Sequence, residues 1–163
     1  MSPDEADFRH VYEQAFPVVY RVAYRFAGRR ETAEDAVQEA FARAFERWGR
    51  LRGEPWIVGW IVTTTLNILR RTGRRTAELS HEVEGLHSPE TEPEGALDLW
   101  RAIKELPKRQ GQAVVLHYLI DLPVAQVAEV MGCREGTAKA HLDRGRRRLA
   151  RLLEPSEARQ EDG

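Results

Sequence analysis

Positive side chains gather on one stretch of the sequence, which reads GCREGTAKAHLDRGRRRL from Gly132 to Leu149. Small or apolar residues recur through it and just beyond it at steps of three or four, as along one face of a helix: Ala138, Leu142, Gly145, Leu149 and Leu152. The charged residues between them are Lys139, Arg144, Arg146, Arg147, Arg148 and Arg151. Guanidinium and ammonium groups in such a row can neutralise phosphates, an attraction that salt weakens.

The residues before this helix predict a helix-turn-helix. A short apolar helix is expected over residues 124–131, and it contains Ala128, which is small enough for a close crossing of two helices. Gly132 follows four residues later and tolerates the positive φ that a tight turn needs. The second helix would bury its apolar stripe and leave its arginines for DNA. The alternative is an ordinary helical bundle with a solvated basic face.

Sequence-specific contacts are expected near the start of the basic helix, because this end of a recognition helix reads base edges in the major groove. The candidates at this end are Arg134, Glu135, Lys139, His141 and Arg144. The later arginines would hold phosphates, which positions a protein on DNA without reading its sequence.

The charge of the chain is balanced overall and segregated locally. Its 163 residues include 25 Lys and Arg and 26 Asp and Glu, for a net charge of −1. Residues 76–98 hold acids and no Lys or Arg, between basic clusters at 70–75 and 144–151. Averaged charge therefore says little about partners, whereas local charge predicts two cationic patches separated by an anionic strip.

Composition excludes several classes of protein. No run of about 18 apolar residues occurs, so we expect no membrane insertion, and the acidic N-terminus has no apolar signal region. The single cysteine, Cys133, excludes a disulfide framework and a cysteine-rich zinc site. A reduced, cytoplasmic protein is the expectation.

Helical periodicity fills the N-terminal part. An apolar face over residues 8–26 is expected to be interrupted or kinked at Pro17 and to stop at Gly28. Thr32 with Asp35 resembles a capping box, and it precedes an apolar stripe over residues 36–48. After Pro55, which suits a helix start, a further helix is expected over residues 56–71.

The C-terminal part predicts short helices, and convincing strand patterns are absent. Helices are expected from residue 96 to a stop at Pro107 and over 113–120, ahead of the helix-turn-helix. The fold class is therefore expected to be all-α, with two small helical domains joined by a flexible acidic linker. The expected ranges are a first domain at 1–75, the linker at 76–95, a second domain at 96–154 and a polar tail at 155–163.

Three stretches carry a resemblance to a known family. ETAEDAVQEAFARAFERW, from residue 31, is similar to the family segment AED-x-VQE-x-F. GWIVTTTLNILRR, from residue 59, has the spacing GW-x6-N-x3-R. Residues 106–153 resemble the pattern LP-x-RQ … L-x-x-x-IA-x-x-x-G-x-x-EGT-x-K over its full length. Together they resemble the extracytoplasmic-function (ECF, group IV) sigma factors of the sigma-70 family, promoter-specificity subunits of bacterial RNA polymerase.

The resemblance implies a function and partners. It implies a sigma factor that binds core RNA polymerase and recognises the −10 and −35 promoter elements, with region 2 at 1–75 and region 4 at 96–154. The implied partners are the clamp helices of the largest polymerase subunit, the flap of the second-largest subunit, promoter DNA and an anti-sigma factor. No cofactor, metal or enzymatic activity is implied, because the polymerase carries out the chemistry.

The resemblance also assigns residues to each contact. The core-polymerase contacts would be Glu34, Asp35, Gln38 and Glu39. The −10 contacts would be Trp56, Asn67, Arg70, Arg71, Arg74 and Arg75. The −35 contacts would be Arg134, Glu135, Thr137, Lys139, Ala140, His141, Arg144, Arg147 and Arg148.

The sequence departs from the family where the −10 element would bind. Residues Thr63–Thr65 stand where many relatives have Arg, which puts the strength of promoter melting in question. Strand opening needs aromatic platforms for unstacked bases as well as cations. Trp48 and Trp60 lie on apolar stripes and are expected in the core, whereas Trp56 is the candidate platform.

Two other functions would use the same helix-turn-helix or the same fold. One is a stand-alone transcription regulator whose N-terminal helices dimerise; the exposed acid and amide set of the AED-x-VQE segment argues against it. The other is a sigma-like decoy that binds an anti-sigma factor, against which the arginines of the last helix count. Cys133 and His141 both lie in the predicted helix-turn-helix, but a metal needs further ligands, so no metal site is expected there. Cys133 and His117 are expected to be packing residues.

Overall fold

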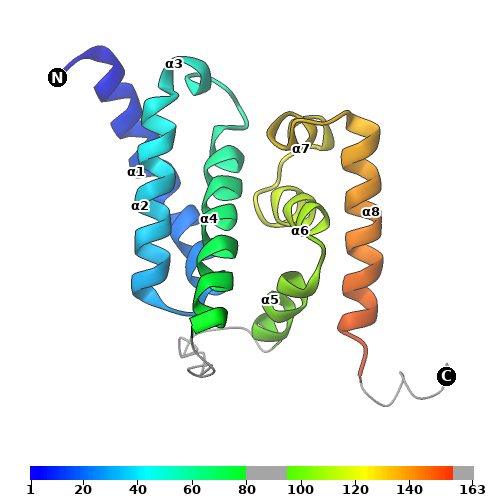
Figure 1. Cartoon of the computed structure of the whole chain (residues 1–163). Helices are drawn as coiled ribbons and strands as arrows, with labels where there is room; N and C mark the ends of the chain where they lie inside the picture. Colours follow the sequence, from blue (N-terminus) through cyan, green and yellow to red (C-terminus); the bar gives the residue numbers. More distant parts are fainter. Residues whose placement is uncertain (80–94, 156–163) are drawn as a thin grey trace. The chain divides into compact units, whose positions relative to one another are not determined.

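The computed structural model describes residues 1–79 and 95–155, except for the side chains of residues 74–79. The remaining residues, 80–94 and 156–163, contain most of the predicted linker and tail, which therefore lie outside the described part. The chain divides into two compact units, Met1–Pro89 and Glu90–Gly163. Both are helical and the described residues contain no strand (Figure 1). This confirms the predicted all-α fold class with two small helical domains.

Three long helices build the first unit. α1 (Pro3–Ala27), α2 (Arg30–Glu46) and α4 (Ile57–Leu79) pack against one another, and the short α3 (Trp48–Leu51) follows α2 (Figure 1). The largest fully buried side chains in this unit are Val19, Val37, Leu51, Ile61, Val62, Thr65 and Leu66. They come from all four helices, so the unit has one shared core.

A reciprocal cap that the sequence analysis did not anticipate begins α1. The Ser2 amide donates to Glu5 Oε2 at 2.7 Å, and the Glu5 amide donates to Ser2 Oγ at 3.2 Å. A capping box of this kind satisfies two of the amides that a helix start leaves without partners. The signal was present in the sequence as Ser followed three residues later by Glu, with Pro3 at the first helical position.

The helix continues through Pro17, so the interruption expected there is wrong. Pro17 is exposed, which lets water bind the carbonyl that loses its amide partner. Gly28 ends the helix as predicted. Its φ is 71°, and its amide donates to the Tyr24 carbonyl at 2.8 Å.

The start of α2 differs from the expected capping box at Thr32 and Asp35. α2 begins earlier, at Arg30, and no side chain caps it. The first turn is closed by the backbone, with the Ala33 amide donating to the Arg29 carbonyl at 3.0 Å. Ala33 is fully buried, so packing against the core decides where this helix begins.

The apolar stripe predicted over residues 36–48 is broken near its end. α2 ends at Glu46, and Trp48 opens α3. Trp48 is buried as predicted, whereas Phe45 is 48% exposed. A single continuous helix could not place both residues in this way, because the break after Glu46 changes the direction in which Trp48 points.

The second unit contains shorter helices. α5 (Ala96–Glu105) is followed by α6 (Lys108–Val114), and α6 continues as a π-helical turn, η1 (Val115–Leu119). The helix predicted over 113–120 therefore starts earlier, directly after Pro107. α7 (Val124–Met131) and α8 (Glu135–Leu152) complete the unit, and both α6 and α7 pack against α8.

α8 and α6 approach each other closely at Gly145. A β-carbon added at Gly145 would lie 2.8 Å from Val114 Cγ2 and 3.2 Å from the Gln110 carbonyl oxygen. Ala138 and Leu142 are buried on the same stripe of α8. The predicted apolar stripe is thus buried as far as Leu149, whereas Leu152 at its end is half-buried. Gly145 in this stripe permits close contact between the two helix backbones.

Gly145→Ala is expected to destabilise the second unit by about 1–3 kcal/mol, because the added methyl overpacks against backbone as well as side chain. Gly136→Ala on the same helix is the matched control, since nothing lies within 4 Å of its added β-carbon. Because Gly136 lies in the first turn of α8, its substitution should raise the stability by less than the gain of about 0.5–1 kcal/mol that applies in the middle of a helix. Urea unfolding, followed by the NMR signal of the Trp100 indole, measures both changes, and equal effects of the two variants would contradict the close contact.

Candidate functional site

The turn between α7 and α8 has the geometry of a Schellman motif. Gly132 has a φ of 64°. Its amide donates to the Glu129 carbonyl at 3.3 Å, and the Cys133 amide donates to the Ala128 carbonyl at 3.1 Å. Ala128 is buried at the crossing. The predicted helix-turn-helix is therefore present, with Gly132 and Ala128 in the positions expected of them.

The predicted −35 residues lie on or just before α8, outside its buried stripe. The exposed ones are Arg134, Glu135, Thr137, Lys139, Arg144, Arg147 and Arg148, and the half-buried ones are Ala140 and His141. Residues three or four apart share a helix face, so Thr137, Ala140, Arg144 and Arg147 form one row. Lys139 lies on the other flank of α8. The structure thus brings four of the nine candidates together in one row, with Lys139 apart.

The imidazole of His141 lies at the edge of the buried stripe. Burial, and then the positive charges of Arg109 and Arg144, lower the pKa of His141 below its ordinary value. The ring is therefore neutral at about pH 7 and can donate one hydrogen bond and accept another.

Arg109 on α6 is a polar link that sequence reasoning missed. Its Nη2 donates to the Met131 carbonyl at 2.7 Å, and its Nη1 donates to Gln112 Oε1 at 3.3 Å. The only signal for it in the sequence was its place in the LP-x-RQ pattern, which says nothing of its contacts.

The predicted polymerase contacts lie along α2, and they differ in their surroundings. Glu34 pairs with Arg30 at 2.9 Å, and Glu39 pairs with Arg43. The hydrogen bond to Glu34 raises the pKa of Arg30 above its ordinary value. Asp35 and Gln38 are both exposed, and no described side chain pairs with either of them. The acid and amide set therefore contains two neutralised carboxylates and two available groups.

The predicted −10 contacts on and before α4 differ in how far they are exposed. Trp56 and Asn67 are half-buried, and Arg71 is exposed. The Arg70 guanidinium lies over the Phe26 ring at 5.2 Å and is half-buried, so it packs against α1. The side chains of Arg74 and Arg75 lie outside the described part.

Trp60 and Thr65 of α4 serve packing. Trp60 is half-buried under the Arg47 guanidinium, which is 5.9 Å from its ring centre. Thr65 is fully buried, and its hydroxyl donates to the Ile61 carbonyl at 2.8 Å. The expectation that Trp60 is a core residue holds only in part, because one face of its ring is covered by a charged side chain.

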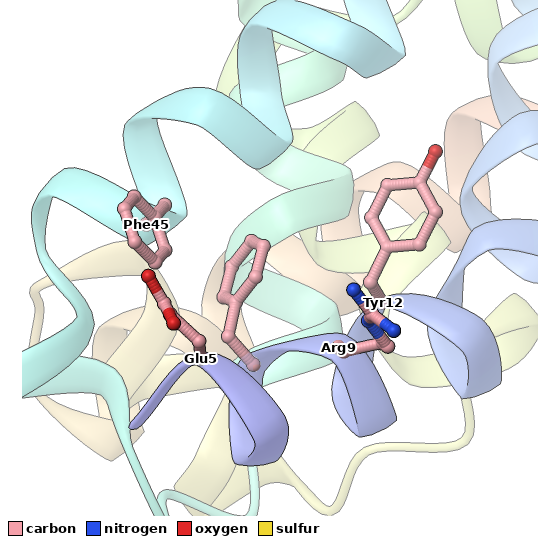
Figure 2. A pocket seen from close by; sticks show the side chains of 5 residues that line it. Glu5, Arg9, Tyr12 and Phe45 are labelled. Carbon is pink, nitrogen blue, oxygen red and sulfur yellow. The ribbon is translucent and has the colours of Figure 1, made fainter. Parts of the chain in front are cut away.

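A shallow aromatic hollow on the first unit was not anticipated from the sequence. Figure 2 shows its lining: Glu5, Phe8, Arg9, Tyr12 and Phe45, around about 370 Å³. The Phe8 and Phe45 ring centres are 5.0 Å apart in an edge-to-face arrangement. The hollow joins the N-terminal part of α1 to the end of α2, and its floor is apolar with Glu5 and Arg9 at the rim.

Cys133 and His117, which the sequence predicts to be packing residues, differ in their surroundings. Cys133 is half-buried rather than fully buried, because the turn leaves it at the surface. His117 is a packing residue as expected, with Nδ1 2.8 Å from the Leu122 carbonyl oxygen. The described ranges contain no group of three or more His, Cys, Asp and Glu that could hold a metal. Within the same ranges, no helix is long and apolar enough to cross a membrane.

Family models match both units. The sigma-70 region 2 model matches residues 11–75, and the sigma-70 region 4 model matches residues 96–149. The second match contains the helix-turn-helix and its turn. The chain therefore belongs to the sigma-70 family, in its extracytoplasmic-function (ECF) group.

Individual relatives agree with this placement. The chain is 33% identical over 98 residues to the ECF RNA polymerase sigma factor SigM of Mycobacterium tuberculosis, a match that covers 60% of this chain and 50% of SigM. It is 36% identical over 111 residues to the ECF RNA polymerase sigma factor BldN of Streptomyces coelicolor, covering 61% and 42%. The chain thus matches half or less of the length of these relatives.

A solved structure shares the fold. It is the sigma factor RpoE from Bartonella quintana in complex with the anti-sigma factor NepR, with a TM-score of 0.70 and 23% identity, covering 90% of this chain and 96% of that chain. At 23% identity, this similarity shows a shared fold.

The pKa of His141 predicts a pH dependence of stability. As the pH falls from about 7 through the ordinary His pKa of about 6.5, the unfolded chain binds a proton that the folded chain resists, so stability should decrease. His141→Gln should remove this part of the decrease, whereas His10→Gln in the other unit should not. Urea unfolding of the second unit at about pH 7.5 and 5.5 measures it, and the same pH dependence in wild type and His141→Gln would contradict the assignment.

Proposed function

We propose that this chain binds core RNA polymerase and directs it to promoters by reading the −35 element with α8 and the −10 element with α4. The observation that carries the proposal is the division of α8 into a buried stripe and an exposed row of Arg144, Arg147 and their neighbours behind a tight turn. A helix of this kind can enter a major groove while its buried stripe stays packed against α6 and α7. The chemistry belongs to the polymerase, and the chain acts in the cytoplasm.

At the −35 element, α8 supplies two kinds of contact. We propose that Arg144, in the exposed row, and Lys139, on the other flank of α8, read base edges; Arg suits guanine because it donates two parallel hydrogen bonds. Arg147 and Arg148 lie further along and hold phosphates. His141, neutral at about pH 7, adds a donor and an acceptor without adding charge.

Among the arginines and tryptophans predicted to contact the −10 element whose side chains the structure describes, Trp56 and Arg71 are the proposed contacts, since Arg70 is engaged with Phe26. Thr65 is committed to the helix interior. α4 has threonine at positions 63–65, where many relatives have arginine. It therefore offers fewer positive charges to the separated DNA strand than those relatives do. We propose that Trp56 supplies the stacking surface and Arg71 a phosphate contact.

The polymerase docks on α2, where Asp35 and Gln38 are exposed and available. A face with acids and an amide suits the basic and polar side chains of the clamp helices. The flap of the second-largest subunit is the proposed contact of the second unit. An anti-sigma factor is a further proposed partner, because the similar RpoE fold was solved with one.

Asp35→Ala/Gln38→Ala is expected to weaken binding to core polymerase by about tenfold or more, because it removes two exposed contacts from the docking face. Glu13→Ala/Gln14→Ala is the matched control: it also removes one exposed acid and one exposed amide, on α1. Fluorescence anisotropy of the labelled chain measures both. Loss of binding in the control would place the docking face on α1, and no binding by the wild type would exclude the initiation-factor function.

Lys139→Ala/Arg144→Ala is expected to abolish selection of a −35 sequence by the holoenzyme while leaving core binding intact. Each lost base contact costs about 1–3 kcal/mol of discrimination. Arg146→Ala/Arg151→Ala removes the same charge and should weaken all DNA binding evenly without changing the selected sequence. Sequencing of duplexes retained from a randomised pool measures both. Unchanged selection by Lys139→Ala/Arg144→Ala would favour a decoy.

A further inference from the structure

Arg109 connects three parts of the second unit. It lies on α6, half-buried, and its guanidinium reaches across the sequence to the last residue of α7 at Met131. Gln112, which is 1% exposed, accepts from the same guanidinium and fixes its orientation. The contact therefore ends where the turn into α8 begins.

The contact occurs at a carbonyl that the turn itself leaves without a partner. In the Schellman motif, Gly132 and Cys133 donate to the carbonyls of Glu129 and Ala128. The Met131 carbonyl points past the end of α7 and has no amide of the helix to bond. A guanidinium there satisfies it and also complements the negative end of the helix dipole.

The helix that carries Arg109 packs directly on α8, where the carbonyl oxygen of the next residue, Gln110, lies 3.2 Å from a β-carbon added at Gly145. The positive charge of Arg109, together with that of Arg144, also helps to lower the pKa of His141 on α8, after burial. Arg109 is thus close to both helices of the helix-turn-helix, and it is fixed to the third helix, α6, on which α8 packs at Gly145.

We infer that Arg109 is a positioning residue for DNA reading: by holding the end of α7 against α6, it sets the angle at which α8 presents its reading row to the groove. This inference rests on the proposed function of α8. Arg109 acts through the turn and does not itself contact DNA. A small change in the turn moves every base-reading residue, because α8 extends from it as a rigid rod.

The test compares Arg109→Met with Lys108→Met, a matched charge removal at the exposed neighbouring residue. The full-length wild-type chain first selects a −35 sequence from a randomised duplex pool. Affinity for the selected duplex and for a scrambled one is then measured over a range of salt concentrations. Arg109→Met should lower the ratio of the two affinities by about tenfold, the discrimination of roughly one base contact, with an unchanged salt slope. Lys108→Met should leave the ratio unchanged.

The alternatives give different results. If Arg109 bound a phosphate, Arg109→Met would reduce the salt slope by about one with the ratio unchanged, which would overturn the inference. If Arg109 only supported folding, both affinities would fall together in proportion to the folded fraction, which would also overturn it. Arg109→Lys can keep the bond to Met131 without the second bond to Gln112, and it should restore part of the ratio. Failure of the wild type itself to select any sequence would overturn the proposed DNA reading, and this inference with it.

A second measurement needs no DNA. Proton NMR titration of His141 should show its pKa rise in Arg109→Met, because one of the two nearby positive charges is removed, and stay as in wild type in Lys108→Met. An unchanged pKa in Arg109→Met would contradict the placement of Arg109 against α8 and would overturn the inference.

Discussion

The burial of one stripe of α8 against α6 is the constraint on which the rest of the second unit depends. A helix that offers its polar side to a ligand must be fixed by its other side, and α8 is fixed by Ala138, Leu142, Gly145 and Leu149. Gly145 decides how close the two helices come, because even one methyl group there would meet the Gln110 carbonyl. The position of α8 follows from that distance together with the turn at Gly132, so the placement of its exposed arginines depends on buried groups.

In the first unit, the position of α2 likewise depends on buried contacts with a neighbouring helix. Here the contacts are made by aromatic rings and not by small residues. Phe8, Tyr12, Phe16, Tyr20 and Tyr24 recur at every fourth position of α1. Neighbouring rings in the row from Tyr12 to Tyr24 lie 5.4 to 6.2 Å apart. Phe41 of α2 packs on two of them. Such contacts favour fixed orientations over a fluid core, which keeps the outer face of α2 in a defined place.

Sequence periodicity correctly predicted the features that depend on nearby residues. It failed for the features that depend on contacts between residues far apart in the sequence. The stripe of α8, the end of α1 at Gly28 and the turn at Gly132 each follow from a few consecutive residues. The start of α2 does not, because the burial of Ala33 outweighs the capping signal of Thr32 and Asp35. Nor could the sequence separate Phe45 from Trp48, since a break of one residue between two helices leaves the apolar pattern unchanged.

The candidate site, too, could be predicted from the sequence only in part. The exposed set of α8 was predictable, because a helix that buries one stripe must expose the others. The contacts of Arg109 and Arg70 were not, because a guanidinium has enough reach to leave its own helix surface and cap or cover another. Sequence position alone assigns such an arginine to solvent, whereas the structure assigns it to a neighbouring helix.

The ion pairs on α2 mean that the proposed docking on that helix would exchange one set of ion pairs for another. A cationic partner group that reaches Glu34 or Glu39 has to displace Arg30 or Arg43, which then returns to water. One exposed pair is broken for each one formed, so the net gain from these two carboxylates is small. Tight association on this face must therefore come from Asp35, from Gln38 and from apolar contact, and partner choice would follow shape more than charge.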